Sequence, residues 1–187
     1  MKAVFVTSNE HKRREAAEIL GFELESAGPE VPEIQSLDVA EVAAAKARAA
    51  YELLGPPPHP VLVEDSGLVI EACNGLPGAL TKWFIQSVGS EGVLRMLPSG
   101  AERAAYAVCA VAVVGGIAGE SVRVFEGIVP GKLALEPQGA SGFGWDPIFI
   151  PKGEERTYAQ MGKDKHEDSH RARAFRAVRE WFEEVDK

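Results

Sequence analysis

Two adjacent carboxylates interrupt a stretch of the sequence, VLVEDSGL at 61–68, that otherwise predicts a buried strand. Glu64 and Asp65 follow three apolar residues, and a Ser-Gly pair comes before the apolar residues resume. The pattern predicts two strand segments, 61–63 and 68–72, separated by a turn. A turn in which Asp65 bonds to the backbone ahead is the simplest explanation. The alternative is a binding site, because ligands of open α/β sheets bind beyond the carboxyl ends of the strands.

The rest of the pattern predicts a mixture of helices and strands. We expect helices over 9–20, 39–53 and 169–185, shorter helices near 82–84 and 91–97, strands over 3–7, 106–114 and 122–129, and a strand or loop at 31–35. The two kinds of element do not alternate strictly, which favours a mixed β-sheet flanked by helices over a purely parallel sheet. The 187 residues fit one large α/β domain or two small lobes.

Composition narrows the class of protein. No apolar run is long enough to span a membrane and the N-terminus does not resemble a secretory signal, so we expect a cytoplasmic protein. A net charge of −8 argues against a nucleic-acid surface, although local lysine clusters can still bind a small anion. Cys73 and Cys109 lack zinc-site or redox spacing, so we expect reduced thiols, with Cys109 in the core.

A lysine lies within the apolar side of the helix expected at 39–53. That side is formed by Val39, Val42, Ala43, Ala49, Ala50 and Leu53, and Lys46 falls at its centre. An inward-facing ammonium group is costly unless an anion meets it, so we expect a buried acid or a bound anionic ligand beside Lys46. The alternative is a side chain that extends along the alanines to the solvent.

The segment TSNEHK at 7–12 joins a strand to a helix. The free N–H groups and the dipole at a helix start favour phosphate, and Lys12 falls in the first turn. Thr or Asn at this position is also a common helix cap. The sequence contains no GxxxxGK[ST] motif, so a phosphate site here would be of another kind.

Two segments near the C-terminus carry groups suited to a flat polar ring. In GFGWDP at 142–147, Phe143 or Trp145 offers an aromatic face and Asp146 could accept from ring N–H groups, although loop packing explains the same residues equally well. His170 and Arg171 begin the last helix on its core-facing side. They could therefore donate hydrogen bonds into a cleft, although polar residues in a first turn are more often solvated.

Acids and lysines together indicate a metal-complexed polyphosphate. Glu33, Glu64 and Asp65 offer the hard oxygen ligands that Mg²⁺ prefers. Lysines neutralise phosphates, and acids hold the metal ion that bridges them.

Seven segments occur in the order of one known family over nearly the whole chain: FVTSNEHKRRE, VPEIQ, VLVEDSGL, GLPGALTKWF, FGWDP, TYAQM and KHEDSHR. The chain resembles the Ham1 family of inosine/xanthosine triphosphate pyrophosphatases. The resemblance implies an elongated mixed β-sheet flanked by helices, in a single domain over 1–187 with two lobes around one central cleft. It also implies a homodimer with Mg²⁺ as its cofactor.

The resemblance implies a role for each matching residue. The triphosphate would be bound by Thr7, Ser8, Asn9, Glu10, His11 and Lys12, with the family usually showing Gly at the position of Ser8, and by the nearby Lys46 and Lys82. Metal ligands would be Glu33 and Asp65, with Asp38 or Glu41 as alternatives to Glu33. Asp65 would be the general base, beside Glu64 and Ser66. The purine base of the nucleotide would be bound by Phe143, Gly144, Trp145, Asp146, Lys165, Ser169, His170 and Arg171.

The implied reaction is hydrolysis of ITP, dITP or XTP to the monophosphate and pyrophosphate, with water attacking the α-phosphate. Donors such as Arg171 and His170 would favour a 6-oxo purine over adenine. A Maf-like pyrophosphatase of other nucleotides is one rival, which the GFGWDP and SHR segments disfavour. A nucleotide-binding regulator without turnover is another, and Glu33, Asp65 and the lysines argue against it.

Overall fold

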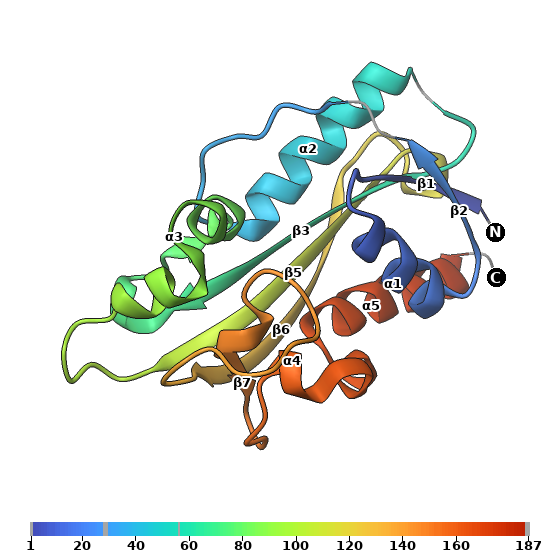
Figure 1. Cartoon of the computed structure of the whole chain (residues 1–187). Coiled ribbons are helices and arrows are strands. Elements are labelled where there is room, and N and C mark those ends of the chain that lie inside the picture. Colours follow the sequence, from blue (N-terminus) through green and yellow to red (C-terminus); the bar gives the residue numbers. More distant parts are fainter. Residues whose placement is uncertain (1, 28–29, 56, 186–187) are drawn as a thin grey trace.

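A computed structural model describes residues 2–27, 30–55 and 57–185 and shows one mixed sheet flanked by helices (Figure 1). The strands are β1 (Lys2–Val6), β2 (Glu23–Ala27), β3 (Val61–Ile70), β4 (Pro77–Gly78), β5 (Ala104–Val114), β6 (Arg123–Leu133) and β7 (Phe149–Pro151). The helices are α1 (Glu10–Leu20), α2 (Val39–Leu54), α3 (Thr81–Arg95), α4 (Tyr158–Met161) and α5 (His170–Val185), and short 3-10 turns include η3 (Asp146–Ile148) and η4 (Gly162–Glu167).

The sheet has the order β2-β1-β3-β5-β6-β7. The short strand β4 pairs with the same edge of β3 as β1 does, but further along it. β1 is parallel to β2 and β3, whereas the remaining pairs are antiparallel. This confirms the expected mixed sheet.

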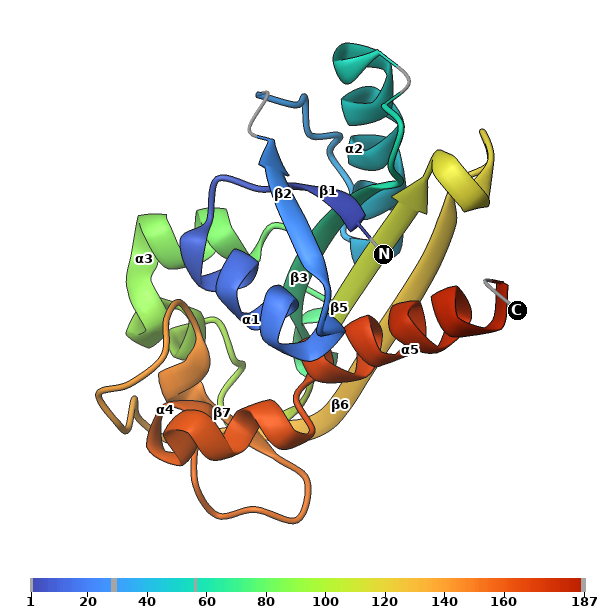
Figure 2. The ribbon, with the colours of Figure 1, turned by 90° about the vertical axis from the view of Figure 1, so that its right-hand side faces the viewer.

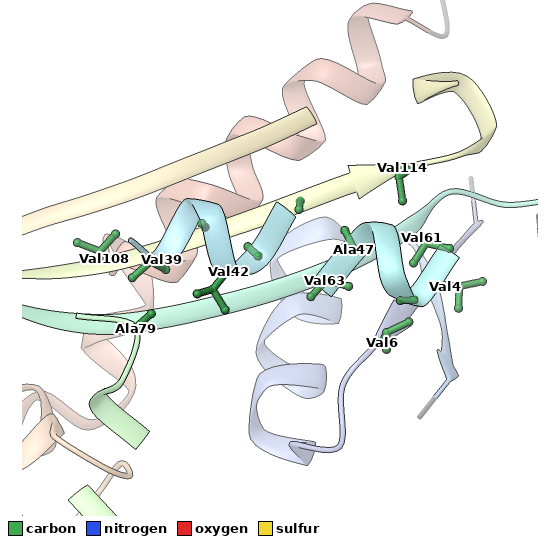
Figure 3. Close-up of a cluster of buried hydrophobic side chains, with 14 residues drawn as sticks. Val4, Val6, Val39, Val42, Ala47, Val61, Val63, Ala79, Val108 and Val114 are labelled. Atoms are coloured by element: carbon green, nitrogen blue, oxygen red, sulfur yellow. The ribbon is translucent and has the colours of Figure 1, made fainter. Parts of the chain in front are cut away.

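Helix α2 covers one face of the sheet, and α1 and α5 cover the other (Figures 1 and 2). Alternate residues of each strand therefore enter different cores. Val61 and Val63 pack with α2 (Figure 3), whereas Leu62 packs with α5. A third hydrophobic core surrounds Trp145 and Phe149. The division into two lobes around a cleft remains a prediction.

The expected break in the strand at 61–70 is wrong. Residues 61–70 form one uninterrupted strand that pairs with β5 along its whole length. Glu64 and Asp65 fit inside it because each carboxylate meets a cation from a covering helix. Gly67 serves close packing and not a turn, since a Cβ at this position would collide with the carbonyl oxygen of Gly78.

Other local predictions have mixed outcomes. The two helical stretches expected after 81 are both present in α3, where Gly89 has a non-helical φ of 68° between them. Residues 31–35 form no strand, and β2 lies in a segment where the sequence indicated none. In α2 the buried side includes Ala47, whereas Leu53 is 60% exposed.

Candidate functional site

The candidate site lies at a gap between neighbouring strands. On one side of β3, β1 pairs only with Val61 and Leu62, and β4 pairs only with Leu68 and Val69. Residues 63–67 between them have no strand partner on this side among the described residues. The carboxyl end of β1, and not that of β3, therefore opens beside the two acids.

Glu64 faces α1 and α5 and is fully engaged there. Arg171 donates to both of its carboxylate oxygens at 3.0 Å, and the Lys12 ammonium lies 3.3 Å from Oε1. A second carboxylate, Glu15 on α1, accepts from the same guanidinium. Burial alone would raise the pKa of Glu64, but Arg171 and Lys12 lower it to about 2. A carboxylate held so firmly in its ionised form is a poor proton acceptor, so the geometry disfavours Glu64 as a base.

Asp65 faces α2, on the opposite side of the sheet, and is less completely paired. The Lys46 ammonium lies 3.5 Å from its Oδ1 and 2.8 Å from Glu33 Oε2. This confirms that an acid meets the inward-facing lysine. Asp65 Oδ2 is buried and has no hydrogen-bond partner among the residues that the structure describes. Burial raises the pKa of Asp65 against the opposing effects of Lys12 and Lys46.

The unpartnered oxygen of Asp65 suits a water molecule or a cation. Glu33 and Asp65 approach the same ammonium, so their carboxylates could share a divalent ion whose remaining ligands are water and phosphate, as Mg²⁺ prefers. No cluster of three His, Cys, Asp or Glu side chains that could hold a metal ion is present within 2–27, 30–55 and 57–185. The alternatives to Glu33 are otherwise engaged, because Asp38 caps α2 and Glu41 accepts from Ser36.

The start of α1 borders the gap. Asn9 caps the helix by accepting from the N–H groups of His11 and Lys12 at 3.0 and 3.3 Å. Thr7 in turn accepts from the Asn9 N–H at 3.1 Å. The turn therefore follows the end of β1 and brings Lys12 to Glu64.

The GFGWDP loop separates into core and surface groups. Trp145 is buried and packs edge-on against Phe149, so it is a core residue and not an open stacking face. Phe143 is half-buried, and its ring centroid lies 5.6 Å from Arg171 Cζ. Asp146 is engaged through one oxygen, since its Oδ2 accepts hydrogen bonds of 2.7 and 3.0 Å from Lys165 and from the Phe143 N–H.

The first turn of α5 is buried, as the sequence predicts. Among the described residues, three of the five N–H groups of Arg171 bond to carboxylates, which leaves two for another acceptor. His170 stacks on Tyr158 with centroids 5.8 Å apart, and its buried Nδ1 has no hydrogen-bond partner within 2–27, 30–55 and 57–185. Burial lowers the pKa of His170, with a further contribution from Arg171. Ser169 accepts from the Ala172 N–H and thus caps the helix.

Comparison with known proteins identifies the family. The model of the Ham1 family matches residues 3–181. The chain belongs to the Ham1 family. It is 41% identical over 186 residues to a dITP/XTP pyrophosphatase of Methanopyrus kandleri, covering 97% of this chain and 96% of that protein. It is 40% identical over 183 residues to an inosine triphosphate pyrophosphatase of Schizosaccharomyces pombe, covering 96% and 94%.

Solved structures of Ham1 proteins share the fold. A HAM1 protein from Coxiella burnetii superimposes with a TM-score of 0.84 at 29% identity, covering 98% of this chain and 99% of that one. The Ham1 protein of Staphylococcus aureus gives a TM-score of 0.82 at 28% identity, with 98% of each chain covered. Among the described helices of this Ham1 chain, none is long and apolar enough to cross a membrane.

Some of the residues implied by the Ham1 resemblance form no hydrogen bond or ion pair with Glu33, Glu64 or Asp65 within the part of the chain that the structure describes. Lys82 is exposed and lies over the ring of Trp83, 5.0 Å from its centroid. Glu10 is exposed and pairs with Arg13 along α1, and Ser8 is exposed as well. Ser66 lies in the gap beside Asp65, and the Gly144 carbonyl accepts from Ser90 at 3.2 Å.

Glu15 is the principal residue that sequence reasoning missed in this Ham1 chain. It is buried on α1 and shares Arg171 with Glu64. The signal was available, because Glu15 precedes Ala16 on the buried side of the helix. That is the same departure from pattern that identified Lys46.

Proposed function

We propose that this Ham1 chain hydrolyses non-canonical purine nucleoside triphosphates, namely ITP, dITP and XTP, to the monophosphate and pyrophosphate. The names of the two relatives described above support this substrate class. The observation that carries the proposal is Asp65, a buried carboxylate with one unpartnered oxygen beside two lysines. Such a group is suited to proton transfer from water at a phosphate site.

Asp65 is the proposed general base. Its Oδ2 is free to accept a hydrogen bond from water, whereas Oδ1 lies toward Lys46. Because burial raises its pKa, the carboxylate is a better base than an exposed aspartate. Glu64 is proposed to position Arg171 and Lys12 instead of taking up the proton.

Glu33 and Asp65 are the proposed ligands of Mg²⁺. Bound there, Mg²⁺ would neutralise charge that develops on the phosphates. Lys46, which now lies between the two carboxylates, would then be available to the substrate. The turn at 7–12 and Lys12 would hold the remaining phosphates through N–H groups and charge.

The proposed base site is formed by Phe143, Lys165 and the start of α5. The two uncommitted N–H groups of Arg171 could donate to a 6-oxo oxygen. Adenine presents an amino group there and would leave a buried donor unpaired, at a cost of about 1–3 kcal/mol. We therefore propose a preference for ITP over ATP.

One experiment tests which nucleotides are substrates, which phosphoanhydride bond is cleaved and whether Mg²⁺ is required. The purified protein is incubated with ITP, dITP, XTP, ATP and UTP, with and without Mg²⁺, and pyrophosphate and phosphate are measured separately. Release of pyrophosphate from the first three, dependent on Mg²⁺, is expected. Binding without turnover would support a regulator instead, and preference for UTP would favour the Maf-like alternative.

We also propose that the protein is a homodimer, on the basis of the family resemblance alone. Sedimentation equilibrium should give twice the mass of one chain, and a single-chain mass at micromolar concentration would contradict this.

A further inference from the structure

The imidazole of His11 stacks on the ring of Phe143, the ring on which we propose that the purine base of the nucleotide binds. The two rings stack with their centroids 5.7 Å apart and their planes 18° apart. His11 belongs to the first turn of α1, and Phe143 belongs to a loop more than a hundred residues later. The contact therefore joins the phosphate end of the proposed site to its base end.

The rest of the Phe143 ring faces cations that are fixed in place. Lys165 Nζ and Arg171 Cζ lie 5.5 and 5.6 Å from the ring centroid. Both side chains are buried, and each is held by a carboxylate, Asp146 or Glu64. Because carboxylates hold these two cations in place, the part of the ring under His11 is the one that can be vacated.

His11 is suited to leaving. Its side chain is exposed. Within the described residues that side chain makes one hydrogen bond, between Nδ1 and Arg14 Nη2 at 3.4 Å. Its backbone N–H is held separately by Asn9 at 3.0 Å. The side chain can therefore rotate into solvent while the helix cap remains in place.

We propose that His11 competes with the purine base for this part of the Phe143 ring, an inference that rests on the proposed function. The imidazole must move away before the base can stack. Competition of this kind reduces the apparent affinity for every base-bearing ligand by the same factor, since each must displace the same group. It does not affect a ligand without a base.

Calorimetric titration of the two products in Mg²⁺ separates these effects. His11→Ala should bind inosine monophosphate about two- to tenfold more tightly, the change in Kd that one stacked aromatic pair represents. Adenosine monophosphate should gain by the same factor, and the Kd for pyrophosphate should not change. His11→Trp, with a larger stacking ring, should weaken binding of inosine monophosphate. Arg13→Ala, a change of a half-buried residue on the same helix, is the matched control.

Two results for the His11→Ala variant would overturn the inference. Equal or weaker binding of inosine monophosphate by His11→Ala would show that His11 does not compete with the base. An equal gain for pyrophosphate would show that His11 acts on the phosphate end. Failure of the proposed function gives a different result. If the wild-type protein binds inosine monophosphate but releases no pyrophosphate from ITP, the proposed hydrolysis is wrong, and the binding data still test the role of His11. A protein that binds pyrophosphate but not inosine monophosphate lacks the base site, and the inference falls with it.

Discussion

Glu64 and Asp65 are consecutive residues of β3, but their carboxylates lie on opposite faces of the sheet. Glu64 meets Arg171 of α5, and Asp65 meets Lys46 of α2. The strand's alternation thus assigns the two acids different surroundings and opposite pKa shifts. The consequences can be separated by mutation.

Asp65→Asn should abolish most catalysis while the fold is retained. Loss of a general base lowers kcat by about 10²- to 10⁴-fold. The amide keeps the shape of the side chain, and Lys46 keeps Glu33 as its partner. Pyrophosphate release from ITP measures kcat, and thermal unfolding checks the fold. Near-normal turnover would exclude Asp65 as the base.

Glu64→Gln should chiefly affect stability. Removing one charge of a buried ion pair leaves Arg171 incompletely compensated, with Glu15 as its remaining acid partner. We expect unfolding free energy to fall by about 3 kcal/mol, measured by urea denaturation. The exposed Glu10→Gln on α1 is the control and should change it by less than about 0.5 kcal/mol. Equal effects of the two changes would contradict the buried network.

Stability should fall as the pH drops below about 6.5. Burial, with a contribution from Arg171, lowers the pKa of His170 in the folded protein below its ordinary value of 6.5. Below pH 6.5 the unfolded chain therefore takes up a proton that the folded chain does not, so stability is full above this pH and decreases beneath it. One such group contributes at most about 1.4 kcal/mol per pH unit. His166 shifts in the same direction.

Urea denaturation at pH 7.5 and 5.5 measures this loss. His170→Gln should reduce the difference between the two pH values, and an unchanged difference would contradict the assignment. A second loss is expected between pH 4.5 and 2, because the pKa of Glu64 is lowered from 4.5 to about 2 and its ionised form stabilises the fold.

Phe143 and Trp145 should respond differently to truncation. Trp145→Ala removes a buried ring from the third core and should cost about 3–5 kcal/mol of stability. Phe143→Ala should cost less stability and raise the KM for ITP, because the ring is half-buried beside the proposed base site. Urea midpoints and steady-state kinetics of both variants decide between these roles. A KM unchanged in Phe143→Ala would place the base elsewhere.

The sequence predicted those features that depart from a local pattern. Lys46 interrupts an apolar helix side, so its need for an acid could be inferred without knowing the partner. The partner of Glu64 could not be inferred, because Arg171 lies 107 residues away in the chain. The expected break in β3 failed for the same reason, since only long-range cations make the acids compatible with a buried strand. Likewise, β2 (ELESA) carries one strongly apolar residue, and its pairing with β1 makes it a strand.

The gap beside β3 also exposes peptide groups within the plane of the sheet. The N–H groups of Leu68 and Ile70 point toward the β4 side, where they bond to Thr81 and Leu76. Because peptide directions alternate along a strand, those of Glu64 and Ser66 point the same way, into the gap that neither β1 nor β4 fills. A bound ligand could therefore complete the unfinished hydrogen-bond ladder. Slower amide hydrogen exchange at these two residues would then register binding in the backbone, independently of every side chain in the site.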